Sequence, residues 1–243
     1  MNPTGAPSSD LWWNLRQLRH SPATWAWVLV IAALEVWVLA VGGYHRQPAA
    51  AWFILLGLSR EGLLAGKLWQ LLSYAFLHGN GWHAALNAVW LLLVGSRIER
   101  IAGPLAMVKA TLFGILGGAI GHLLLAAGGA GAPLLVGLSG GCVGLLLLLT
   151  TLSPDSRMSP LPVSGKNLGI GILAAELFFA LIDPALGLPF ASGLGRILVA
   201  HGWGGTFQMG HACHFGGGIA GWLYGRWLLR SPITLDQIRR RRA

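Results

Sequence analysis

Long apolar runs alternate along the chain with short polar or glycine-rich segments. Six of these runs lie near residues 24–43, 83–102, 105–127, 138–153, 168–186 and 209–229. A helix needs about 20 apolar residues to cross a bilayer, so the pattern predicts an all-α membrane protein, a bundle of six transmembrane helices. Residues 44–82 are only partly polar, and we expect an outer loop folded into short amphipathic helices that are partly embedded in the membrane interface.

Composition supports a membrane protein and argues against other classes. The chain is 54% hydrophobic and 10% charged, with 36 glycines among 243 residues, which excludes an ordinary soluble domain. The net charge of +9 could indicate nucleic-acid binding, but its distribution does not. With the N-terminus inside, the outer segments hold four basic residues and the cytoplasmic segments hold the other thirteen of the 17. The four are Arg46, Arg60, Lys67 and Arg196.

This asymmetry follows the positive-inside rule and predicts that both termini are cytoplasmic. The chain then divides into a short N-terminal segment (1–23), a six-helix membrane domain (24–229) and a basic tail (230–243). We expect no cleavable signal peptide, because the first apolar run is long and follows a basic segment. The expected location is a bacterial inner membrane. Residues 184–208 are expected to form a glycine-rich outer loop.

Polar side chains gather where the second, fourth and sixth apolar runs begin. The second opens with His83 and Asn87, which share a helix face; the fourth opens with Ser139, and the sixth with His211 and His214. With the N-terminus inside, all three runs start on the outer side. Polar groups at membrane depth are costly and tend to be functional, so we expect one site just below the outer surface.

The residue types at this site point to nucleophilic catalysis. A serine becomes reactive when a base such as histidine takes its proton, and the N-terminus of a helix at Ser139 supplies backbone N–H groups for an oxyanion. We expect no acid beside His214, which predicts a Ser–His dyad rather than a triad. Glu176 is interpreted as a buried polar contact. The glycine spacing favours His214 as the base, with His211 nearer the surface, lining the way into the site.

Two other acidic residues are assigned structural roles. Glu35 is expected either to extend its carboxylate to the membrane surface or to bond a neighbour near the outer end of the first run. Glu99 is expected to form an ion cluster with Arg97 or Arg100 at the inner end of the second run.

The motifs together resemble those of the rhomboid family of intramembrane serine proteases, over roughly residues 60–225. The chain carries a Gly-x-Ser-Gly motif at 137–140 and a His-x-x-Gly-x-x-x-Gly motif at 214–221. His78, then His83-x-x-x-Asn87, is similar to the family's second-helix motif, Gly95-x-x-x-Glu99 is similar to the end of that helix, and Trp69 matches the tryptophan of its Trp-Arg pair.

The resemblance implies a nucleophile, Ser139, and a base, His214. It also implies an oxyanion hole formed by His83, Asn87 and the backbone N–H of Ser139. The implied supporting residues are Gly137, Gly140, Gly217, Gly221 and His78. The implied reaction hydrolyses peptide bonds in or beside a transmembrane helix through an acyl-enzyme, without metal or cofactor. The implied partners are transmembrane-helix substrates and the lipid bilayer, with no nucleic acid, and the oligomeric state stays open.

Three features depart from the family pattern, and one is the length of the outer loop 184–208, which affects access from that side. Gln70 stands where the Trp-Arg pair has arginine, which affects a contact of the first loop. Val143 stands four residues after Ser139, where many members carry a tyrosine that packs on the catalytic histidine. Without that ring, the orientation of His214 must come from other neighbours.

Two alternatives remain beside the protease. A catalytically inactive relative that binds transmembrane helices would keep the fold; the presence of Ser139 and His214 argues against it, whereas Gln70 and Val143 favour it slightly. A small-solute transporter or channel would use the polar stripe as a pathway. The close helix packing indicated by the glycines and the few charges at mid-membrane argue against a conduction path.

Overall fold

The computed structural model describes residues 20–44, 46–127, 132–158 and 161–230. Every regular element in these ranges is a helix, so the all-α prediction is confirmed. The extended pairings in this part of the chain are two isolated bridges, Leu58 with Leu135 and Arg157 with Ser164. Residues 1–19 and 231–243 lie outside the described residues, and most of the two predicted cytoplasmic segments falls there.

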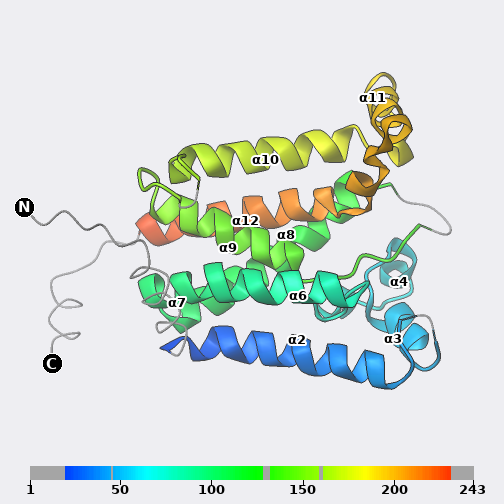
Figure 1. Cartoon of the computed structure of the whole chain (residues 1–243), viewed down its shortest axis with the longest axis horizontal. Coiled ribbons are helices and arrows are strands. Elements are labelled where there is room, and N and C mark those ends of the chain that lie inside the picture. The colour runs from blue at the N-terminus through cyan, green and yellow to red at the C-terminus, as the bar shows by residue number, and fades with distance from the viewer. Residues whose placement is uncertain (1–19, 45, 128–131, 159–160, 231–243) are drawn as a thin grey trace, which may run out of the picture.

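Long helices form a bundle in which α2 lies along one edge and α10 along the opposite edge (Figure 1). Each lies within a few residues of a predicted apolar run. They are α2 (Pro22–Ala40), the continuous series α6 (Gly81–Trp90), η3 (Leu91–Gly95) and α7 (Ser96–Ala102), then α8 (Pro104–Leu125), α9 (Ser139–Leu152), α10 (Gly165–Leu181) and α12 (His211–Arg230). The starts of α6, α9 and α12 lie toward the end of the bundle where α3, α4 and α11 gather (Figure 1).

The described helices differ in how well they suit a bilayer. By length and composition, α2 and α8 are long and apolar enough to cross a membrane, and α9 is apolar but shorter. Glycines and histidines lower the hydropathy of α12. Large apolar side chains such as Leu29, Leu124 and Ile170 are exposed on the outside of the bundle, as a lipid-facing surface requires. The number of six spans remains a prediction.

The segment between α2 and α6 contains short helices. They are α3 (Ala49–Leu56), α4 (Arg60–Leu64), α5 (Gln70–Ser73) and η2 (Tyr74–Phe76). α3 carries apolar side chains on every face and is therefore not amphipathic. Gln70 is fully buried and donates from Nε2 to the carbonyl oxygens of Ile54 and Leu55, at 3.3 and 3.1 Å. The amide at position 70 thus ties α5 to the end of α3 without a charge.

Short helices occupy most of residues 184–208, where the sequence predicts a glycine-rich loop. They are η4 (Pro184–Leu186), α11 (Ala191–Leu198), η5 (Val199–Trp203) and η6 (Gly204–Gln208). Residues 187–190 are not helical, and η5 is kinked at His201 and Gly202. The buried Ser192 organises the start of α11, because its hydroxyl accepts from the N–H of Leu188 and donates to the carbonyl of Asp183. Side-chain bonds of this kind specify a helix start that glycine content alone does not reveal.

Glycines bring α8, α9 and α12 into backbone contact. A Cβ on Gly217 would lie 2.2 Å from the carbonyl oxygen of Gly140, and one on Gly221 would lie 1.9 Å from that of Gly144. On α8, a Cβ on Gly114 would lie 2.8 Å from Cα of Gly141. No side chain fits at these positions, so the three helices pack at the distance that small residues permit. This packing sets how α9 and α12 face each other.

Glu99 has a different role from the expected ion cluster. Its carboxylate is buried and accepts hydrogen bonds from the N–H groups of Ala23 and Thr24 and from the Thr24 hydroxyl, at 2.8 to 3.0 Å. It forms no ion pair with Arg97 or Arg100 in the described part of the chain. The carboxylate instead satisfies N–H groups in the first turn of α2, where the helix dipole favours negative charge.

Candidate active site

Ser139 and His214 lie in hydrogen-bond contact at the starts of two helices. Ser139 is the first residue of α9, and its Oγ lies 2.8 Å from Nε2 of His214, in the first turn of α12. Both residues are partly buried. The backbone N–H of Ser139 belongs to the first turn of α9, whose donors have no partner within the helix. A nucleophile, a base and the N-terminus of a helix therefore occur at one place.

Gly137 forms the turn that leads into Ser139. Its φ of +116° is a conformation that side chains with a Cβ rarely adopt, and a Cβ there would lie 2.5 Å from Cε1 of His83 and 2.8 Å from its Nε2. Both the turn and the close approach of the ring require glycine. The imidazole of His83 consequently lies against the turn, two residues before Ser139.

His83 and Asn87 lie one turn apart on α6, which Asn80 caps by accepting from the N–H of His83 at 2.8 Å. Asn87 is 5% exposed, and its Nδ2 has no hydrogen-bond partner among the described residues. A buried amide donor without a partner is costly and is available to a ligand. α6 therefore brings one ring and one free donor to the region around α9.

His78 supports His83 from the segment that precedes α6. It is 2% exposed, and the two imidazole rings meet edge to face with centroids 5.1 Å apart. Burial, and to a lesser degree the neighbouring His83, lowers the pKa of His78 to about 3. The ring of His78 is therefore neutral near pH 7 and packs beside His83 without a charge.

Gly140 allows α12 to approach the start of α9. A Cβ on this residue would lie 2.7 Å from Sγ of Cys213, the neighbour of His214. Cys213 is fully buried, and its Sγ lies 3.7 Å from the hydroxyl of Tyr74. Together with Gly217 and Gly221 on α12, Gly140 lets the backbones around Ser139 and His214 touch.

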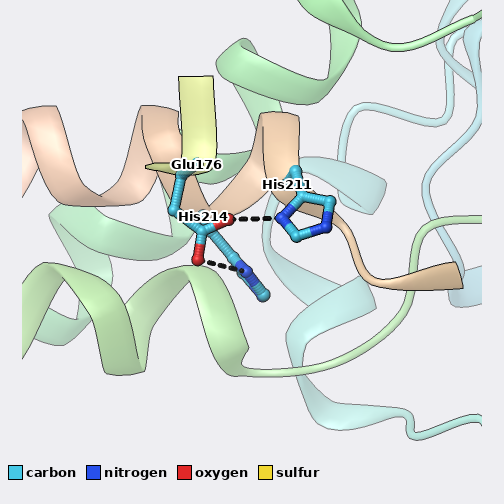
Figure 2. Close-up of side chains that lie close together, drawn as sticks. All are labelled: Glu176, His211 and His214. Carbon is cyan, nitrogen blue, oxygen red and sulfur yellow. Dashed lines mark hydrogen bonds and ion pairs between the residues drawn. The ribbon is translucent and has the colours of Figure 1, made fainter. Parts of the chain in front are cut away.

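An acidic residue does lie beside His214, contrary to the expectation from the sequence. Glu176 on α10 places Oε1 3.2 Å from Nδ1 of His214 and Oε2 2.6 Å from Nδ1 of His211. Figure 2 shows both rings, from the first turn of α12, directed at the two carboxylate oxygens. The expectation that His211 lines the way into the site is also wrong, since His211 is buried and pairs with Glu176.

Sequence reasoning missed this contact because it depends on how α10 is rotated against α12. Glu176 and Phe179 lie three residues apart, and Phe179 stacks on His211 with ring centroids 5.1 Å apart. His211 and His214 are also three residues apart. Residues at i and i+3 share a helix face, so each of the two apolar helices presents a pair of such residues on one face. The equal spacing of the two pairs is the feature of the sequence that could have indicated this contact.

The same cluster could hold a metal ion. The ligand atoms of Glu176, His211 and His214 lie within 4.8 Å of one another, and two histidines with one carboxylate are a donor set that zinc uses. However, both carboxylate oxygens and both Nδ1 atoms already form hydrogen bonds with each other. Binding a metal through these atoms would require breaking those bonds.

Val143 lies one turn after Ser139 and packs on α12 beyond His214. A Cβ on Gly218 would lie 3.3 Å from Cγ1 of Val143. The ring nearest to His214 among the described aromatic contacts is His211, edge to face with centroids 6.2 Å apart. His214 therefore takes its orientation from Ser139 and Glu176 rather than from a stacked ring.

Comparison with known proteins identifies relatives of this chain. The profile of the Rhomboid domain matches residues 65–231, more than half of the chain. A 106-residue stretch is 26% identical to "Rhomboid protease GlpG" from two strains of Klebsiella pneumoniae. The match covers 43% of this chain and 37% of each relative, so it spans little more than a third of their length. With its domain match, its helical fold and its motif residues, the chain belongs to the rhomboid family.

Proposed function

We propose that this chain is an intramembrane serine endopeptidase that cleaves transmembrane or juxtamembrane segments of membrane proteins. The observation that carries the proposal is the 2.8 Å contact between Ser139 Oγ and His214 Nε2 at the start of α9. A base within hydrogen-bond distance of a serine at a helix N-terminus is the arrangement that nucleophilic catalysis requires. Membership of the rhomboid family and the name of the Klebsiella relatives support the same activity.

In the proposed mechanism, Ser139 Oγ attacks the carbonyl carbon of the scissile bond while its proton moves to Nε2 of His214. The carbonyl oxygen becomes an oxyanion. The backbone N–H of Ser139 and the side chains of His83 and Asn87 donate to it, and the unpartnered Nδ2 of Asn87 supports this role. The tetrahedral intermediate expels the amine, which takes the proton from His214. Water then hydrolyses the acyl-enzyme by the same steps, and no metal takes part.

An apolar groove beside the site suits a peptide that leaves a membrane. The groove has a volume of about 320 Å³ and lies close in sequence to two parts of the site, since Gly79 follows His78 and Val136 precedes Gly137. Its lining is completed by Tyr44, Ala50, Phe53, Ile54 and Leu134. A transmembrane segment that contains residues of low helix propensity can present an extended strand in this groove. The proposed topology places both termini of the enzyme in the cytoplasm of a bacterial cell.

The test is labelling of the purified chain in detergent with a fluorophosphonate, which reacts with activated serines. We expect labelling of the wild type and none of Ser139→Ala, with a severe loss in His214→Ala. Ser156→Ala and His201→Ala, at exposed positions away from the site, are the matched controls. Labelling that persists in Ser139→Ala contradicts the proposal. A folded wild type that never labels but binds transmembrane peptides supports the inactive relative instead.

A further inference from the structure

We propose that Glu176 is a positioning residue for His214, so that the catalytic unit of this chain is a serine–histidine–glutamate array rather than a dyad. This rests on the proposed function, because it assigns a role in the same reaction. The carboxylate contacts no reacting atom. It acts through His214, whose Nδ1 lies 3.2 Å from Oε1.

The first step of the argument is the tautomer of His214. As a base, this histidine must accept the Ser139 proton at Nε2, which lies 2.8 Å from Oγ. The neutral ring then carries its hydrogen on Nδ1, and that hydrogen faces a carboxylate oxygen, an acceptor. A carboxylate in this place selects the productive tautomer and stabilises the imidazolium that forms when the serine proton arrives.

The second step is the charge of the carboxylate in an apolar bundle. Nε2 of His211 lies 2.9 Å from the carbonyl oxygen of Thr206, which can only accept, so this nitrogen carries a hydrogen. Nδ1 of His211 lies 2.6 Å from Oε2 of Glu176. One further proton on this contact makes the Glu176–His211 pair neutral overall, as a buried site favours. With that proton on Nδ1 of His211, Glu176 stays a carboxylate and Oε1 remains a charged acceptor for His214.

The third step is how rigidly the carboxylate is held. Phe179, one turn after Glu176 on α10, stacks on the ring of His211 with an interplanar angle of 24°. α10 therefore contacts His211 through the stacked ring of Phe179 and through the carboxylate of Glu176. The hydrogen bond to His211 in turn holds the Glu176 side chain in place (Figure 2). Because Val143 provides no ring that packs on His214, the hydrogen bonds of Glu176 orient the imidazole of His214.

The experiment compares Glu176→Gln with the wild type, using a fluorophosphonate on the full chain in detergent. Glutamine keeps the shape but removes the charge, and Glu61→Gln is the matched control at an exposed position on α4. We expect Glu176→Gln to lower the maximal labelling rate roughly 10- to 100-fold, the usual effect of losing a charge-assisted hydrogen bond. The concentration of fluorophosphonate at half-maximal rate should not change, because Glu176 does not touch it. A folded Glu176→Gln variant that labels within about twofold of the wild type overturns the proposal.

A second measurement covers the case in which Glu176→Gln fails to fold. In the wild type, the hydrogen on Nδ1 of His214 should give a strongly downfield proton NMR signal that disappears in His214→Ala. A wild type that labels at Ser139 without such a signal overturns the proposal, and so does labelling abolished by 1,10-phenanthroline, which would indicate a metal in the cluster. A wild type that shows the signal but never labels contradicts the proposed function and leaves the Glu176 contact established.

Discussion

At the scale of single residues, the site depends on positions where one extra carbon is not tolerated. Gly137 has a positive φ, and the ring of His83 lies where a Cβ on this residue would be. Ser139 follows two residues later. The turn therefore couples the backbone conformation at the nucleophile to the position of a proposed oxyanion donor.

Gly137→Ala should lower both stability and reactivity. Adopting a positive φ costs alanine about 1–2 kcal/mol, and the methyl group would also displace His83. Gly66→Ala separates the two effects, since Gly66 has a φ of +82° with open space around it. We expect both variants to melt at lower temperature, but only Gly137→Ala to label more slowly with a fluorophosphonate. Equal labelling rates would show that the contact with His83 has no catalytic consequence.

Sequence motifs predict some of the site residues but not the contacts between helices. The sequence singles out Ser139 and His214, and the structure brings them into contact, while the sequence predicts no more than a buried polar contact for Glu176. Spacing within one helix can be read directly because residues at i, i+3 and i+4 share a face. The partner of that face on another helix depends on rotation and crossing angle, which the sequence pattern leaves open.

At the scale of elements, α12 is held against α9 by backbone contact. Gly221→Ala would place a methyl group 1.9 Å from the carbonyl oxygen of Gly144, so the helices would have to separate. We expect a loss of about 1–3 kcal/mol from overpacking, seen as a lower melting temperature in detergent. Labelling at Ser139 should also slow, because His214 moves with α12.

The matched control for that variant is Gly171→Ala on α10. A Cβ there meets nothing within 4 Å, and alanine is the better helix former by about 1 kcal/mol. The control should be as stable as the wild type or more stable. If both variants melt at the same temperature, close packing at Gly221 does not limit the assembly of α9 and α12.

A second element-scale prediction concerns α2. Glu99 accepts three hydrogen bonds from Ala23 and Thr24. In a glutamine, the amide NH₂ group would face one or more of these donors and could not accept from them. We expect Glu99→Gln to destabilise the first turn of α2 by about 1–3 kcal/mol, measured as faster hydrogen exchange at the N–H groups of Ala23 and Thr24. Glu61→Gln should leave that exchange unchanged, and unchanged exchange in Glu99→Gln would contradict the capping role.

At the scale of the whole molecule, the proposed topology puts α4 and the connection between α9 and α10 on opposite sides of the membrane. Glu61→Cys and Ser156→Cys test it, because both positions are exposed while the native Cys142 and Cys213 are buried. With a membrane-impermeant maleimide on intact bacteria, we expect Glu61→Cys to react and Ser156→Cys to react only after lysis. The reverse pattern would invert the topology and place the site on the cytoplasmic side.

The all-α class, the approximate bounds of the long helices and the residues expected to carry the chemistry could be predicted from the amino-acid sequence. These follow from apolar run length and from short motifs, which are properties of neighbouring residues. Three features required the tertiary structure: the short helices within residues 184–208, the cap that Glu99 forms on α2, and the position of Glu176 between His211 and His214. Each of these depends on groups distant in the chain or on side-chain hydrogen bonds, and hydrophobic patterning carries no information about which face of one helix meets which face of another.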